Sequence, residues 1–231
     1  MGRLPSGDPI GGEVRTFHST READYRGGMK QETEVSLSVK PANEASAADL
    51  EAVFGSRGYA ATCQCQWFKI SHSEWRSVPV DELGSRLREQ THCGDPAARA
   101  TSGLVAYLDG EPVGWCAVEP HTAYLRLARM RVPWVNRDED KADDGVWAVT
   151  CFVTRAGFRK RGVSRTLARA TVDFARDRGA RAVEGYPLVN EPGKQFSWGE
   201  LYVGSRSIFA DAGYAEVSRP TPRRVVMRID F

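Results

Sequence analysis

The segment GFRKRGVS, residues 157–164, places three basic residues before a glycine and a small serine. It follows the apolar run VWAVTCFV at 146–153 and precedes a stretch whose apolar residues recur at helical spacing. A strand, a glycine-containing loop and a helix N-terminus bring free backbone N–H groups and the positive end of a helix dipole to one point. The segment therefore predicts an anion-binding site, for which phosphate is the usual occupant.

Two common phosphate-binding loops do not match this spacing. The nucleoside-triphosphate loop requires lysine directly before its serine or threonine, whereas Val163 stands in that place here. The dinucleotide fingerprint needs three glycines in the order G-x-G-x-x-G, and this loop has only Gly157 and Gly162, at the wrong separation. Nucleoside triphosphates and nicotinamide or flavin dinucleotides are therefore poor candidates.

The loop resembles the pyrophosphate loop of the GCN5-related N-acetyltransferase (GNAT) superfamily, which reads (Arg/Gln)-x-x-Gly-x-(Gly/Ala) between a central strand and a helix. Residues 159–164 match this pattern except at the last position, where Ser164 replaces glycine or alanine. The resemblance extends over residues 33–231 and includes the segments AYLDGEPVGWCAV and SIFADAGYAEV. It implies a mostly antiparallel central sheet, with acyl-CoA bound where the central strands splay.

The resemblance also implies acetyl-CoA, or another acyl-CoA, as cofactor. The backbone N–H groups at the helix start are expected to hold the pyrophosphate, and the strand end is expected to pair with the pantetheine arm. Arg159 and Lys160 are expected either to contact the 3′-phosphate or to face water. The residues expected at the cofactor are Phe152, Val153, Thr154, Arg159, Lys160, Arg161, Gly162, Val163, Ser164 and Arg165.

Acyl transfer from a thioester to an amine requires a neutral amine, a polarised carbonyl and a protonated leaving thiol. Backbone N–H groups at 152–154 are suited to polarise the carbonyl. The family often places a tyrosine acid four residues before a glycine-aromatic pair, and this chain has Phe209 there. The remaining candidates are Tyr202 as the acid and Glu184 or Glu119 as the base, and each carboxylate fits an ordinary pairing or surface role equally well.

The predicted function is therefore an acyl-CoA-dependent N-acetyltransferase in which the amine of a small molecule or a protein attacks the thioester directly. A covalent intermediate is not expected, because Cys151 lies in an apolar strand where a thiol is usually inert. A metal is not expected either, since CQC has one residue between its cysteines where zinc sites have two to four. Because Phe209 replaces the tyrosine, the alternative is a non-catalytic acyl-CoA-binding or interaction protein.

Composition argues against several other partners. The chain has 231 residues and a net charge of +2, which is too small to favour nucleic acid or membrane binding through bulk electrostatics. No apolar run approaches the roughly 18 residues of a membrane helix, and the first residues lack the apolar core of a signal peptide. Five cysteines without framework spacing are typical of a reducing compartment, so we expect a cytoplasmic monomer or homodimer.

The order of periodic segments predicts a mixed α/β (α+β) sheet flanked by helices, in one domain at 31–231. Residues 1–30 read as an N-terminal extension without periodicity, and flexibility is expected there. The predicted strands are 33–40, a hairpin at 103–120, 146–153, 180–189 and 223–231, and the predicted helices are 46–55, 80–90, one from 163, and 205–213. The aromatic-rich segment 63–75 is left unassigned.

Overall fold

The structure is a computed structural model that describes residues 15–19, 35–189, 196 and 199–231. These residues form an eight-stranded sheet in the order β1-β2-β3-β4-β5-β6-β8-β7, in which only the neighbours β5 and β6 are parallel. The strands are β1 Arg15–Ser19, β2 Val35–Pro41, β3 Gly103–Leu108, β4 Glu111–Pro120, β5 Val146–Thr154, β6 Ala182–Gly185, β7 Ala215–Thr221 and β8 Arg224–Asp230. The predicted mixed, mostly antiparallel sheet is confirmed.

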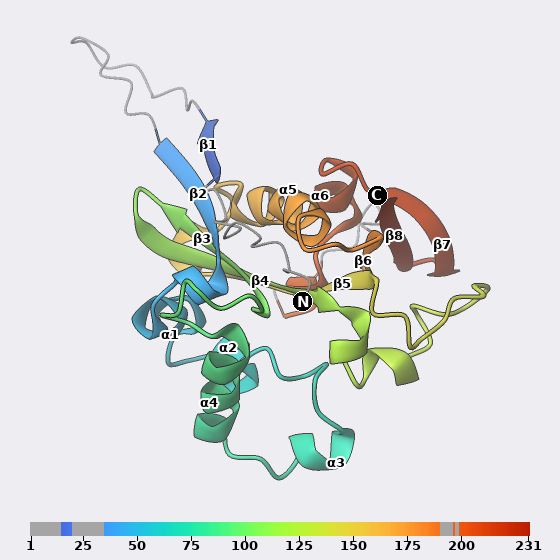
Figure 1. The fold of residues 1–231 in the computed structure, drawn as a ribbon, viewed down its shortest axis with the longest axis horizontal. Helices are drawn as coiled ribbons and strands as arrows, with labels where there is room; N and C mark the ends of the chain where they lie inside the picture. Colours follow the sequence, from blue (N-terminus) through green and yellow to red (C-terminus); the bar gives the residue numbers. More distant parts are fainter. Residues whose placement is uncertain (1–14, 20–34, 190–195, 197–198) are drawn as a thin grey trace, which may run out of the picture.

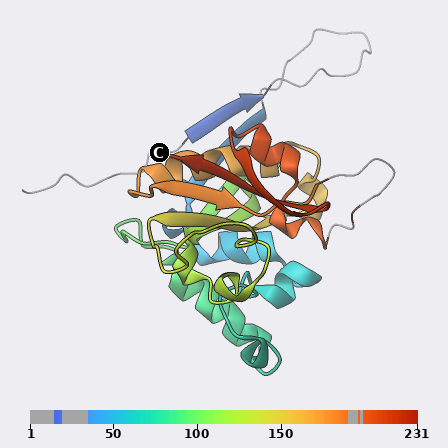
Figure 2. The same cartoon turned by 90° about the vertical axis from the view of Figure 1, so that its right-hand side faces the viewer.

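Helices cover both faces of this sheet, as Figures 1 and 2 show. They are α1 Ala47–Phe54, α2 Tyr59–Cys63, α3 His72–Trp75, α4 Val80–Thr91, α5 Val163–Arg176 and α6 Arg206–Ala210. On one face, Leu167 and Phe174 of α5 pack with Val118 of β4. On the other face, Phe54 of α1 packs with Trp115 of β4. The described helices therefore flank the sheet on both sides, as predicted.

Local sequence signals set several of these elements. Ser46 caps α1 by accepting a hydrogen bond from the Asp49 N–H at 3.1 Å, and the Asp49 carboxylate accepts one from the Ser46 N–H at 2.9 Å. The β3–β4 hairpin turns through Asp109 and Gly110, whose φ angles of 51° and 83° are both left-handed. Two such residues give the tight turn that matches the twist of paired strands. Both predictions are confirmed.

Other parts of the sequence prediction differ from the structure. The strand predicted at 180–189 is shorter, because β6 ends at Gly185 and Pro187 has no N–H to extend a ladder. The sequence reading missed β7, an edge strand whose burial alternates between exposed and intermediate, so its side chains carry little apolar period. It also left α3 unassigned, which is only four residues long.

Residues Arg15–Ser19 lie within the predicted N-terminal extension and form β1, which pairs antiparallel with β2 (Figure 2). The rest of residues 1–30 lies outside the described residues, so the division into 1–30 and 31–231 stays a prediction. Within the described residues, no helix has the length and apolar character needed to cross a bilayer.

Candidate functional site

The sheet opens between β5 and β6. These strands pair only from Val146 opposite Ala182 to Val149 opposite Gly185. β5 then continues to Thr154 with β4 as its neighbour on the other side, so the edge of residues 150–154 is not paired with β6. The central strands therefore splay here, as predicted, and leave backbone N–H and C=O groups available along one edge of β5.

A β-bulge bends β5 at the point where the opening begins. Ala117 faces Cys151 and the next residue of β4, Val118, faces Val149, so Thr150 is an extra residue without a partner. Bulges bend a strand and change the direction of its side chains, and they occur often next to active sites. The bulge thus directs the last residues of β5 away from β6.

The loop after β5 ends in a helix start with free backbone donors. Lys160 and Gly162 have left-handed φ angles of 61° and 83°. The first helical hydrogen bond of α5 runs from the Thr166 N–H to the Gly162 oxygen at 3.0 Å. The N–H groups of residues 163–165 consequently have no acceptor within the helix. Left-handed residues followed by a helix N-terminus form a concave set of donors suited to an anion.

Two small residues hold this helix start against the sheet. The Ser164 and Thr154 hydroxyl oxygens are 3.3 Å apart, which links the first turn of α5 to the end of β5. A Cβ atom on Gly114 of β4 would lie 2.5 Å from Cγ1 of Val163, so α5 can approach β4 only because this residue is glycine. Sequence reasoning missed Gly114, although a glycine inside a predicted strand is the signal that could have found it.

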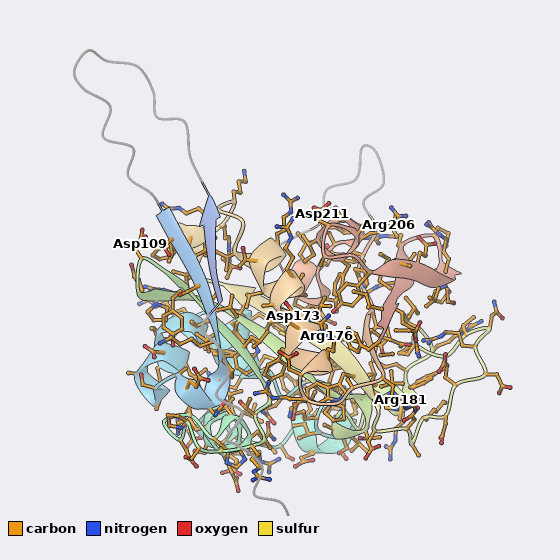
Figure 3. The ribbon with its side chains drawn as sticks, turned by 45° about the horizontal axis from the view of Figure 1, so that its top comes forward. Asp109, Asp173, Arg176, Arg181, Arg206 and Asp211 are labelled. Atoms are coloured by element: carbon orange, nitrogen blue, oxygen red, sulfur yellow. The ribbon has the colours of Figure 1, made fainter. Side chains whose placement is uncertain are left out.

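Part of the positive charge of the loop has a structural role. The Arg155 guanidinium donates to Glu111 Oε1 at 2.8 Å and to the Pro112 carbonyl at 2.7 Å, which ties the loop to the β3–β4 hairpin. Arg161 lies over the ring of Phe158, 5.4 Å from its centroid. Asp211 lies at the end of α6 (Figure 3). It forms an ion pair with Arg165 at 2.8 Å. These contacts fix the loop and hold the first turn of α5 against the end of α6.

A cavity of about 1580 Å³ lies along the loop and the free edge of β5. Its other walls come from residues 52–60 and from residues 199–208. Single small-molecule sites are typically about 300–1,000 Å³, so this cavity has room for a cofactor and a second molecule. The predicted cofactor residues that line it are Phe152, Val153, Thr154, Arg159, Lys160, Gly162, Val163, Ser164 and Arg165. Arg161 is not among them.

A sequence profile described as the acetyltransferase (GNAT) family matches residues 66–192, which is more than half of the chain. The chain belongs to the acetyltransferase (GNAT) family. The matched part includes the β3–β4 hairpin, β5 and the phosphate-type loop with α5. The family resemblance inferred from residues 159–164 is therefore confirmed.

Several solved structures are similar to this GNAT protein. They include yncA from Salmonella typhimurium with its cofactor acetyl-CoA, at 12% identity and a TM-score of 0.47, covering 84% of this chain and 93% of that one. Aminoglycoside acetyltransferase AAC(6')-Ib in complex with coenzyme A shares 16% identity, with a TM-score of 0.45 and coverage of 84% and 94%. Ribosomal-protein-alanine N-acetyltransferase from Brucella melitensis also shares 16%, with a TM-score of 0.45 and coverage of 84% and 99%. A search of curated proteins found no match.

The end of the cavity away from the loop is lined by phenols and thiols, among them Tyr59, Cys63, Cys65, Cys151 and Tyr202. The rings of Tyr59 and Tyr202 are 6.2 Å apart. Burial raises the pKa of the Tyr202 phenol, and it raises the pKa of the Cys63 thiol to about 11. Both groups are therefore protonated at neutral pH. Sequence reasoning missed Tyr59, because no local pattern links α2 to the loop before α5.

Of the three predicted catalytic residues of this GNAT protein, Tyr202 lines the cavity, whereas Glu184 and Glu119 are not among its described lining residues. Glu184 is only 1% exposed and lies between two guanidinium groups. Arg137 donates to its Oε2 at 2.9 Å, and Arg228 donates to its Oε1 at 2.6 Å. Both carboxylate oxygens are thus engaged, which favours a structural role for Glu184.

Glu119 has a different environment. It projects from β4 on the same side as Trp115, whose indole N–H donates to Cys65 Sγ at 3.2 Å. Its carboxylate forms an ion pair with Lys69, and the side chains of the two are 16% and 8% exposed. Burial raises the pKa of Glu119, and the Lys69 charge opposes this shift. Glu119 therefore lies behind the cavity wall with its charge already matched.

Proposed function

We propose that this protein is an N-acetyltransferase that transfers an acetyl group from acetyl-CoA to an amine by direct attack on the thioester. The observation that carries the proposal is the continuous path from the donors at residues 163–165 to the free edge of β5. Both lie on one cavity that is large enough for two molecules. Membership of the acetyltransferase (GNAT) family supports the same reaction.

The residues of this path suit coenzyme A. The left-handed Gly162 and the helix start after it offer backbone N–H groups to the pyrophosphate. The edge of β5 at residues 150–154 offers N–H and C=O groups that an extended pantetheine arm can pair with, as an added strand would. Acetyl-CoA, when bound, supplies the thioester that the amine attacks.

The chain's own groups have three tasks in this proposal. Backbone N–H groups near Phe152 polarise the carbonyl, as oxyanion donors do. Tyr202 provides the proton for the departing thiol, because it lines the cavity and a tyrosine phenol, with an ordinary pKa of about 10, is protonated at neutral pH. Cys151 is not assigned as a nucleophile, since contact with Cys65 and burial raise the pKa of its thiol.

No base is assigned in contact with the amine. Among the described residues that line the cavity there is no carboxylate. Both carboxylate oxygens of Glu184 accept hydrogen bonds from arginines. Glu119 would have to separate from Lys69 before it could accept a proton. The proposal is therefore that the amine enters in its neutral form, having lost its proton to water.

The test is Gly162→Glu, which adds bulk, negative charge and left-handed strain where the pyrophosphate is proposed to lie. We expect it to abolish coenzyme A binding in calorimetry. Gly179→Glu is the matched control, because Gly179 also has a left-handed φ, of 80°, and open space around it, but it follows α5 and is remote from the loop. The control should bind coenzyme A and should unfold at a temperature similar to that of Gly162→Glu.

Unchanged coenzyme A affinity in Gly162→Glu would contradict the proposal that the pyrophosphate binds at the start of α5. Thiol release from acetyl-CoA with a panel of amines then separates catalysis from binding alone. Tight coenzyme A binding without release for any amine would support the non-catalytic acyl-CoA-binding alternative, which the Phe209 replacement keeps open.

A further inference from the structure

The two ends of the cavity differ in chemistry. Every charged residue among its described lining residues is a cation: Arg57, Arg155, Arg159, Lys160 and Arg165. Four of these five belong to the loop and the start of α5, where the phosphates of the cofactor are proposed to bind. The opposite end carries the rings of Tyr59, Tyr202 and Phe196 together with Leu201. The space beyond the cofactor is thus walled mainly by aromatic and apolar groups.

These rings form a row that leads from the surface into the core. Tyr59 and Tyr202 have centroids 6.2 Å apart with planes tilted by 39°, and Tyr202 and Phe68 have centroids 6.2 Å apart with planes tilted by 44°. Favourable aromatic pairs have centroids about 4.5–7 Å apart. Phe68 is 4% exposed, so the inner end of the row is held rigidly by the core. The cavity side of Tyr59 and Tyr202 is therefore a fixed aromatic surface.

Tyr59 is unusually accessible for a residue in such a row. It is 49% exposed and is one of five large apolar side chains that are exposed in the described part of the chain. A ligand ring placed against it would remove apolar surface from water and add an aromatic pair. A tyrosine phenol has an ordinary pKa of about 10, so this surface is uncharged at neutral pH.

The charges on the cavity walls also limit the chemical class of the acceptor. An acceptor with several ammonium groups would find no described carboxylate among the residues that line this cavity to pair with them. A single amine at the apolar end has a smaller electrostatic cost, because desolvation there favours its neutral, reactive form. A single amine on an aromatic skeleton suits both the absence of a described carboxylate and the apolar wall, whereas a polyamine carries several charges and an aminosugar has a polar skeleton.

We propose that the acceptor is a primary amine carried on an aromatic skeleton, whose ring packs against Tyr59 and Tyr202. The inference rests on the proposed function. The amine nitrogen forms a bond to the acetyl carbonyl carbon, and the carbon–sulfur bond of the thioester breaks. The sulfur leaves as a thiol with a proton from Tyr202, the surplus proton of the nitrogen passes to water, and the Tyr202 phenolate regains a proton from water. The products are an N-acetyl aromatic amine and coenzyme A.

The first experiment compares phenethylamine, cyclohexylethylamine and spermidine as acceptors, with thiol release as the assay. Phenethylamine and cyclohexylethylamine match in length and in the position of the amine, and they differ in the aromaticity of the ring. We expect a KM for phenethylamine about two- to tenfold below that for cyclohexylethylamine, as an aromatic pair provides. Spermidine should be the poorest of the three. Equal KM values for the two ring amines, or preference for spermidine, would overturn the inference.

The second experiment uses variants of the two rings. Tyr59→Ala should raise the KM for phenethylamine about tenfold and leave the affinity for coenzyme A unchanged, and Tyr59→Phe should recover most of the loss. Tyr202→Phe keeps the ring and removes the proton donor, so it should lower kcat with little change in KM. Val80→Ala, an exposed α4 residue outside the cavity, is the control and should match the wild type. A Tyr59→Ala variant with unchanged KM would overturn the inference.

Binding distinguishes the failure of this inference from failure of the proposed function. Saturation-transfer NMR measures contact of phenethylamine protons with the protein in the presence of coenzyme A. Ring contact that disappears in Tyr59→Ala supports the inference independently of turnover. A protein that binds coenzyme A but neither contacts nor acetylates phenethylamine overturns the acceptor class alone. A protein that does not bind coenzyme A overturns the proposed function itself.

Discussion

At the scale of single residues, Glu184 shows that a carboxylate whose place in the sequence fits a catalytic base can instead have a structural role. It stands on the strand next to the opening of the sheet, so it fitted the position of a base. Arg137 and Arg228 both donate to it, and the Tyr186 hydroxyl donates to Oε2 at 3.2 Å. A base needs a free lone pair directed at the substrate, and these contacts occupy that capacity.

We therefore predict that Glu184→Gln destabilises the fold more than it harms the chemistry. The Arg137 side chain is 6% exposed and that of Arg228 is 13% exposed, so both would lose a charge partner in a buried place. Breaking a buried ion pair from one side costs about 3–5 kcal/mol, and because Arg137 still pairs with Glu139 and Arg228 with Asp230 we expect a loss at the lower end of this range, which urea unfolding should detect. At temperatures where the variant is folded, coenzyme A affinity and turnover per folded molecule should remain near wild type.

Glu216→Gln is the control for this prediction. Glu216 pairs with Arg206 and Arg219 near the surface, and the three side chains are 24% to 48% exposed. Its loss should cost about 1 kcal/mol or less. A Glu184→Gln variant with wild-type stability and lost turnover would instead identify Glu184 as the base.

At the scale of elements, the site depends on the close approach of α5 to β4. Val163, the first residue of α5, lies against Gly114, and the loop that precedes it is tied to the hairpin by Arg155. The donors at the start of α5 therefore have a fixed position relative to the free edge of β5. A change on β4 can alter the anion site without touching the loop.

We predict that Gly114→Ala weakens coenzyme A binding by several-fold. Its Cβ would lie 2.5 Å from Val163 Cγ1 and 3.2 Å from Leu167 Cδ1, so the first turn of α5 must move outward. Gly110→Ala in the turn of the same hairpin is the control: its φ of 83° makes alanine strained, by about 1–2 kcal/mol, but nothing lies within 4 Å. Both variants should melt earlier than wild type, and only Gly114→Ala should bind coenzyme A more weakly in calorimetry. Equal affinities in the two variants would contradict this role of Gly114.

At the scale of the whole molecule, the sequence predicted the features that local chemistry specifies. The cap of α1 at Ser46, the Asp109-Gly110 turn and the glycine loop before α5 each depend on residues within a few positions of one another. The loop also sufficed to indicate the family, because its spacing and its place between a strand and a helix are both readable in the sequence.

Features that depend on distant contacts could not be predicted in this way. β7 is an exposed edge strand with a proline, and pairing with β8 rather than its own pattern makes it a strand. Tyr59 and Tyr202 are far apart in the chain and meet only because α2 and residues 199–208 close over the end of β5. The partners of Glu184 come from the loop before β5 and from β8, so its structural role cannot be predicted from the residues around it in the sequence.

The distribution of charge over the molecule leads to the last prediction. The net charge is only +2, yet the described charged residues of the cavity are all cations. If their field attracts the phosphates of coenzyme A, affinity should fall as salt shortens the screening length from about 10 Å at 0.1 M to about 3 Å at 1 M. We expect the dissociation constant to rise several-fold over this range, and less so in Lys160→Gln. Lys141→Gln, on the loop before β5 and outside the cavity lining, should keep the wild-type slope. Affinity that is insensitive to salt in the wild type would assign binding to the backbone N–H groups and would contradict a contribution of the Lys160 charge.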